Sequence, residues 1–80
     1  MAKKGDLVDW VQHALTSAGG SATILYVAQY IWKNYKDELE KNDLFYTWQY
    51  DMRWAATELR KRGVMVPAEN DSRGKWTLKI

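Results

Sequence analysis

The chain has 80 residues, a net charge of +2, no cysteine and one histidine. So short a chain is expected to form a single domain over residues 1–80, ordered from about residue 6, with Trp and Tyr filling its core. Without cysteine there are no disulfides or thiolate metal sites, and His13 alone cannot hold zinc, so no metal or cofactor is expected. No apolar run reaches the ~20 residues of a membrane span. The start also lacks a signal-peptide pattern, which favours a cytoplasmic protein of prokaryotic or phage type.

The first predicted helix runs from Asp6, its expected N-cap, to about Ala18. Its apolar residues recur at helical spacing: Leu7, Val11, Ala14 and Ala18. Gly19 then suits the left-handed conformation that ends many helices. After Gly20, residues 21–22 are a candidate short strand.

A second helix is predicted to start after Thr23, which is a good N-cap. Its apolar stripe consists of Ile24, Val27, Ala28, Ile31 and Tyr35, and its outer face carries Tyr26, Gln29, Tyr30 and Lys33. This helix is expected to fray within the acidic segment 36–43, where Asn42-Asp43 predicts a turn. Residues 44–46 are then expected to be a connection that packs on the core.

The third helix is predicted over residues 47–62, capped by Thr47 and ended by Gly63 after a basic last turn. One arc of this helix is apolar: Trp48, Met52, Ala55, Ala56 and Leu59. After Gly63 the period changes to two, so 64–66 and 75–80 are predicted strands joined by the polar loop 68–74. The predicted fold is therefore α+β, a three-helix bundle followed by a β-hairpin over 64–80.

Three stretches carry a family resemblance: GGSATILYVAQYI at 19–31, WAATELRKRGVMV at 54–66 and RGKWTL at 73–78. Together they resemble the N-terminal winged-helix domain of Mrr-type restriction endonucleases, over about residues 7–79. The resemblance implies a winged helix whose third helix recognises DNA and whose hairpin is the wing. In that family a separate nuclease domain cuts the DNA. These 80 residues contain no such domain, so no enzymatic activity is expected.

The outward arc of the third helix offers groups that bind phosphates and base edges. Residues 53–80 hold seven Lys/Arg and three Asp/Glu, a balance of +4, whereas residues 1–52 hold five and seven, a balance of −2. Arginine can bind phosphate or guanine bidentately, and glutamine can bind adenine. The predicted contacts with double-stranded DNA are Gln49, Tyr50, Arg53, Thr57, Arg60 and Lys61 on the helix and Arg73 and Lys75 on the wing.

The aromatic residues on the outer faces leave a second hypothesis open. Trp54 is expected either to pack against the wing or the 44–46 connection, or to mark a partner surface together with Tyr26, Tyr30 and Tyr50. In the latter case the chain is a protein-interaction or dimerisation module, and a homodimer would combine this patch with DNA binding. A basic helix face is also common on ordinary solvated surfaces, so charge alone does not decide between these hypotheses.

Overall fold

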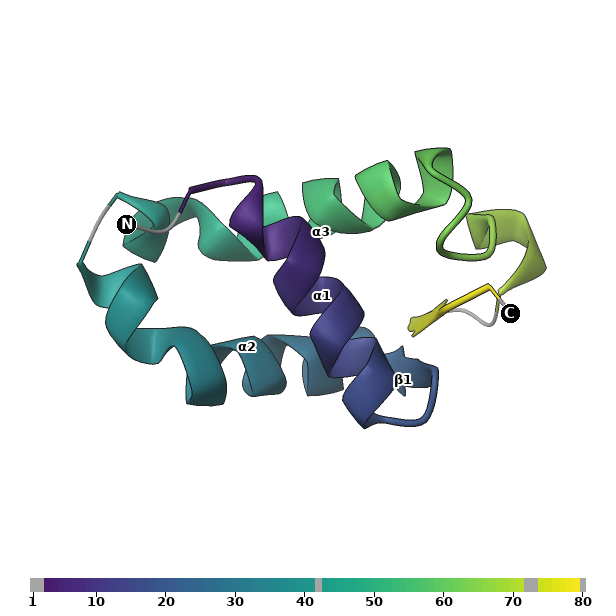
Figure 1. The fold of residues 1–80 in the computed structure, drawn as a ribbon, viewed down its shortest axis with the longest axis horizontal. Coiled ribbons are helices and arrows are strands. Elements are labelled where there is room, and N and C mark those ends of the chain that lie inside the picture. The colour runs from purple at the N-terminus through teal and green to yellow at the C-terminus, as the bar shows by residue number, and fades with distance from the viewer. Residues whose placement is uncertain (1–2, 42, 72–73, 80) are drawn as a thin grey trace.

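The structure, a computed structural model, describes residues 3–41, 43–71 and 74–79. Its architecture is α+β (Figure 1). The elements in chain order are α1 (Asp6–Ser17), β1 (Ser21–Thr23), α2 (Ile24–Glu40), α3 (Leu44–Lys61), a 3-10 helix (Ala68–Asn70) and β2 (Lys75–Thr77). The predicted fold class and the order of helices before the C-terminal strand are confirmed at this level.

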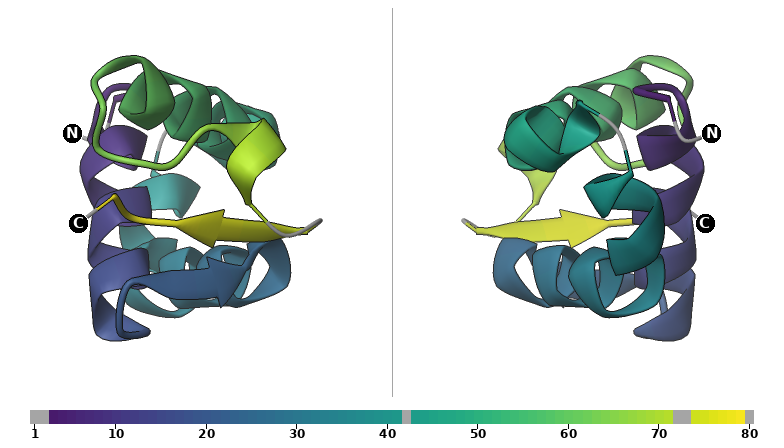
Figure 2. Two further views of the ribbon diagram at one scale, coloured as in Figure 1. Left: turned by 90° about the vertical axis from the view of Figure 1, so that its right-hand side faces the viewer. Right: turned by 90° about the vertical axis from the view of Figure 1, so that its left-hand side faces the viewer.

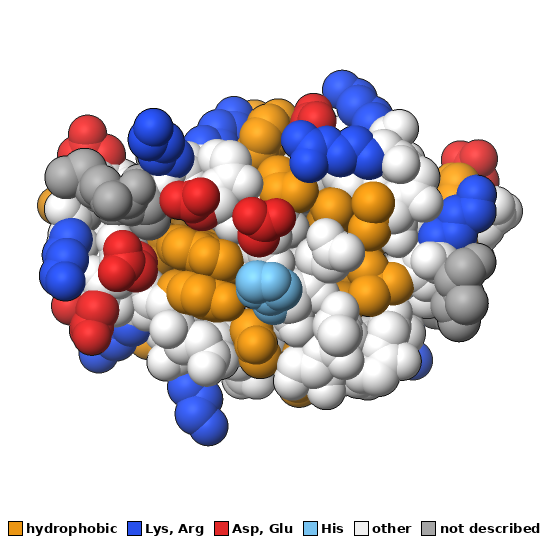
Figure 3. All heavy atoms as spheres, viewed as in Figure 1, with side chains coloured by type: hydrophobic (Ala, Val, Ile, Leu, Met, Phe, Trp, Pro, Cys, Tyr) orange, Lys and Arg blue, Asp and Glu red, His pale blue; other side chains and the backbone are white. Residues whose placement is uncertain are grey.

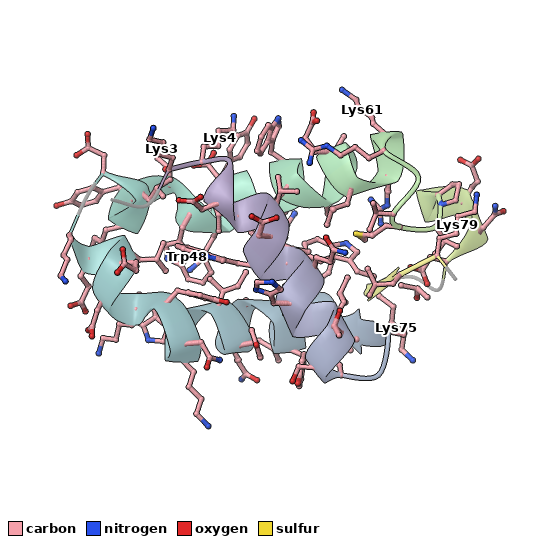
Figure 4. The ribbon with its side chains drawn as sticks, viewed as in Figure 1. Lys3, Lys4, Trp48, Lys61, Lys75 and Lys79 are labelled. Carbon is pink, nitrogen blue, oxygen red and sulfur yellow. The ribbon has the colours of Figure 1, made fainter. Side chains whose placement is uncertain are left out.

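The core lies between the three helices. α2 and α3 run along opposite sides of the molecule and α1 crosses both, as the end-on views also show (Figures 1 and 2). Buried side chains meet there from every helix: Leu7, Val11 and Leu15 from α1, Val27, Ile31 and Leu39 from α2, and Met52, Ala55 and Leu59 from α3. Trp48 also points into the space between α2 and α3 (Figure 4). The apolar spacing in the sequence therefore identified most of these positions, but not Leu15 and Leu39.

The two helix starts that were predicted from capping residues differ in outcome. Thr23 is the N-cap of α2 as expected, since its Oγ1 accepts a hydrogen bond from the Tyr26 N–H at 3.1 Å. Asp6 is not a cap: it is the first residue of α1, Gly5 holds the cap position, and Asp6 Oδ2 accepts a hydrogen bond from the Lys3 N–H instead. Gly19 has a φ of +86°, which confirms the predicted left-handed stop.

The structure differs most from the prediction at the boundary between α2 and α3. α2 continues to Glu40, with non-helical angles at Tyr35, and α3 begins at Leu44 rather than at residue 47. The connection between the helices is therefore short, and residues 44–46 form the first turn of α3. Thr47 lies inside that helix and donates a hydrogen bond from Oγ1 to Asp51 Oδ2 at 2.8 Å.

The sheet joins distant parts of the chain. Among the described residues it has two antiparallel strands, β1 and β2, with Ala22 opposite Trp76 (Figure 2). The predicted strand 64–66 is wrong as a full strand: only Met65 forms a bridge, to Leu78. The backbone hydrogen bonds Val66 N–H to Thr77 O and Lys79 N–H to Val64 O flank that bridge. Part of the predicted polar loop forms the 3-10 helix, and Ile80 lies outside the described residues.

Candidate nucleic-acid interface

The outward side of α3 carries a shallow depression lined by Tyr50, Arg53, Trp54 and Thr57. These residues recur at helical spacing opposite the buried stripe, so packing of the core directs them outward. The side chains of Tyr50, Arg53 and Thr57 are exposed, Tyr50 to 76%. The Thr57 hydroxyl donates a hydrogen bond to the Arg53 carbonyl at 3.3 Å, which keeps it close to the helix backbone. Four of the residues that the sequence singled out therefore lie together.

Trp54 is half-buried and its partner comes from the N-terminus. The indole packs against the edge of the core, and Lys4 Nζ lies 4.4 Å from the centroid of its ring. Such a distance is typical of a cation–π contact. Trp54 was expected to pack against the wing or against residues 44–46. In the structure it contacts Lys4, in the segment that precedes α1.

The Lys4–Trp54 contact places basic residues from the N-terminus beside those of α3. Lys3, Lys4 and Lys61 all lie along the edge of the molecule that α3 forms (Figure 4). Several blue Lys and Arg side chains lie along this upper edge in the space-filling view, with red Asp or Glu and orange hydrophobic side chains between them (Figure 3). Glu58 also lies here, 3.8 Å from Lys61 Nζ. Lys3 and Lys4 are not among the predicted contacts, although both are present in the MAKKGD start, because no pattern along the chain links that start to α3.

Arg60 differs from the other predicted contacts on α3 because it is hydrogen-bonded to a later segment of the chain. Its side chain is partly buried, and its Nε donates a hydrogen bond to the Val66 carbonyl at 3.3 Å. The chain turns back after α3 at Gly63, so residue 66 lies beside the last turn of the helix. Arg60 therefore links α3 to the segment that follows it, through one of the five N–H donors of its guanidinium.

Gln49 lies in a different depression, with Trp32, Phe45 and Trp48. Here the Trp32 and Trp48 rings are stacked with centroids 6.0 Å apart, and Phe45 lies 6.3 Å from Trp32. Because α3 starts at Leu44, Gln49 lies in its second turn, beside Trp32 from the middle of α2. It is not part of the Tyr50–Trp54 depression.

The two predicted DNA contacts on the wing, Arg73 and Lys75, are not seen beside α3 in the described residues. Arg73 lies outside the described residues. Lys75 is exposed on β2 opposite Thr23, and in Figure 4 it lies at the edge beside β1, on the other side of the molecule from Lys61. Lys79 lies at the same end of the molecule as Lys61 (Figure 4). A basic wing tip beside α3 is therefore absent from the described part of the chain.

The proposed aromatic patch is divided between two helices. Tyr26 and Tyr30 line a depression on α2 with Ser17, Gln29, Lys33 and Asn34, whereas Tyr50 and Trp54 line the one on α3. The two depressions share no residue. A single patch is what the sequence predicts, because the pattern of residues does not reveal how α2 and α3 are arranged.

Comparison with protein-family models, curated proteins and solved structures finds no significant match to this chain. The resemblance to Mrr-type domains therefore stays a prediction. No helix in the described part of the chain has the length and apolar character to cross a bilayer. Within those same residues, no three His, Cys, Asp or Glu side chains are grouped so that they could hold a metal ion.

Proposed function

We propose that this chain is a non-catalytic module that binds double-stranded DNA through the outward face of α3. The observation that carries the proposal is the Lys4–Trp54 contact, which sets a lysine from outside the helix on the same face as Arg53. Charges from two separate segments thus converge on one exposed helix. Basic residues gathered on one face are the electrostatic footprint typical of nucleic-acid binding.

The arrangement of the strands supports a winged-helix interpretation. β2 pairs with β1 on one side and, through the Met65–Leu78 bridge, approaches the segment after α3 on its other side. Three helices with a sheet of this connectivity leave one face of α3 exposed, at Tyr50, Arg53, Thr57 and Lys61, as a recognition helix requires. In this proposal α3 enters the major groove.

Each residue on the face has a chemical role in the proposal. Arg53 has five N–H donors in a planar fork and binds a phosphate or a guanine edge. Lys4 and Lys61 neutralise phosphates on the two flanks of the groove. Tyr50 and Thr57 supply hydroxyls that bond phosphate or base edges. Compared with the sequence-based prediction, the N-terminal lysines take the place of Arg60 and the wing.

A salt titration with duplex DNA tests the proposal. The logarithm of the binding constant should fall with the logarithm of salt concentration, by about 0.9 per phosphate neutralised. Arg53→Ala should weaken binding about tenfold, the equivalent of ~1.4 kcal/mol. Lys4→Ala should reduce the salt slope by about one phosphate contact.

Lys36→Ala is the matched control, because this exposed lysine lies on α2 and pairs with Glu40 at 3.8 Å. It should change neither affinity nor slope. Equal losses for Lys36→Ala and Arg53→Ala would show non-specific attraction to a cationic chain. The absence of saturable binding to any duplex at low salt would remove the proposal.

The aromatic residues at the start of α3 favour self-association as a second candidate function. Tyr46 is 83% exposed and Phe45 42%, and their rings contact edge to face with centroids 5.2 Å apart. Large exposed aromatics next to each other are typical of partner surfaces. Sedimentation of the wild type and of Tyr46→Ser at rising concentration tests this candidate: a monomer at all concentrations contradicts it.

A further inference from the structure

The depression on α2 is distinct from the proposed DNA face. It is lined by Tyr26, Gln29, Tyr30, Lys33 and Asn34 from one side of α2, with Ser17 from the end of α1. Residues three and four apart on a helix share a face, so these five necessarily project together. No residue of this depression lines the one on α3.

The lining of this depression consists of hydrogen-bond donors. Hydroxyl, amide and ammonium groups supply an N–H or O–H from all six lining side chains, and only Lys33 is charged. Asn34 donates one of its two amide hydrogens to the Tyr30 carbonyl at 2.9 Å, which leaves its second hydrogen for a ligand. None of the lining side chains within the described residues is acidic. The hydroxyl and amide groups can also accept, so it is the Lys33 ammonium, with no carboxylate in the lining, that favours an anion.

Two aromatic faces accompany the donors. The rings of Tyr26 and Tyr30 are stacked one helical turn apart, with centroids 6.4 Å apart and planes inclined by 26°. The Tyr26 hydroxyl lies 3.5 Å from Ser17 Oγ, which holds that ring against the end of α1. Tyr26 is 37% exposed, and Tyr30 is half-buried against the core. Nucleobases stack on the accessible faces of aromatic rings, with little dependence on base identity.

From this juxtaposition we infer that the α2 depression binds a nucleotide, with the base on the tyrosine rings and the phosphate at Lys33. Gln29 and Asn34 are placed to bond the sugar or the base edge. The nucleotide is either a free mononucleotide or a unit of a single strand, because both offer the same base and phosphate. This inference does not rest on the proposed duplex binding at α3.

The test is an NMR titration of the ¹⁵N-labelled chain with four probes: dTMP, thymidine, inorganic phosphate and a short single-stranded oligothymidylate. The inference expects dTMP or the oligonucleotide to shift the side-chain amides of Gln29 and Asn34 and the ring signals of Tyr26 and Tyr30. Thymidine and phosphate, which each supply half of the ligand, should bind more weakly. Saturation by dTMP identifies a free nucleotide site, and saturation by the oligonucleotide alone identifies a single-strand site.

Variants make the outcome decisive. Lys33→Gln should weaken binding about tenfold, whereas the same change at the exposed Lys36 of α2, Lys36→Gln, should leave it unchanged. Tyr30→Leu should also weaken binding, and thermal midpoints check that each variant folds. Arg53→Ala should have no effect here, which separates this site from the α3 face. Absence of any shift at millimolar probe, or equal losses for Lys33→Gln and Lys36→Gln, would overturn the inference.

Discussion

The guanidinium of Arg60 and the carbonyl of Val66 are joined by a hydrogen bond of 3.3 Å. It connects the last turn of α3 to the segment that pairs with the end of β2, across the chain reversal at Gly63. The side chain that the sequence assigned to DNA recognition is therefore a structural link between a helix and the sheet.

Arg60→Ala should lower the free energy of unfolding by about 1 kcal/mol, because the half-buried Val66 carbonyl loses its side-chain donor. For a domain of this size that corresponds to a fall of roughly 4–8 °C in the thermal midpoint. Arg62→Ala, at an exposed position two residues later, is the control and should shift the midpoint much less. Equal midpoints for both variants would show that the Arg60 bond contributes nothing.

Thr47→Val should destabilise the fold by about 1–3 kcal/mol. Asp51 is only 7% exposed, and the change removes the hydroxyl that donates to its carboxylate at 2.8 Å. Thr57→Val is a matched change on the same helix, because Thr57 is exposed and bonds only a nearby helix carbonyl. Urea denaturation should separate the two variants clearly; a larger loss for Thr57→Val contradicts this account.

Gly63→Ala should cost about 1–2 kcal/mol, since Gly63 has a φ of +76° and the left-handed region penalises a Cβ. A Cβ at this position meets open space, so the backbone conformation alone sets the cost. Gly5→Ala provides the comparison: it adds the same methyl group, also into open space, at a φ of −63°. Thermal unfolding should therefore show a marked loss for Gly63→Ala and little change for Gly5→Ala.

Stability should depend on the ionisation of Tyr35 at alkaline pH. Burial raises the pKa of Tyr35 above its ordinary value of 10.0, and Tyr30 and Asp9 raise it further. The folded state thus favours the neutral phenol. This preference adds its full contribution to the free energy of unfolding below pH ~10, and that contribution is lost as pH rises through the pKa that Tyr35 has in the folded state. Tyr35→Phe removes this group, so the stability difference between wild type and variant should shrink above that pH in urea titrations. A difference that stays constant with pH would contradict the shift.

The outcome at α3 shows which features local sequence can predict. Thr23 was identified as a cap because its hydroxyl needs only the amide three residues later. Thr47 has the same local appearance, yet Leu44 is buried in the core and the helix extends back to include it. Tertiary packing outweighed capping chemistry there.

Among the site residues too, helical spacing predicted some positions, and others depend on tertiary packing. The helical period of α3 correctly placed Tyr50, Arg53, Trp54 and Thr57 together. The Lys4–Trp54 contact could not be predicted, because it depends on how α1 crosses α3. Likewise, the period put Arg60 on the outer arc, and only the path of the chain after Gly63 turns it toward Val66.

The pairing of β1 with β2 sets the order in which the domain can be completed during synthesis. The Ser21 and Thr77 hydroxyls, 2.9 Å apart across the two strands, are separated by 56 positions in the sequence. All three helices emerge from the ribosome before the residues that pair with β1, so this strand stays an open edge that other chains could join. Closing such a long loop is a late and entropically costly step. In refolding followed by hydrogen exchange, we expect the Leu78 amide, bonded to the Gly20 carbonyl at 2.7 Å, to gain protection after the helix amides.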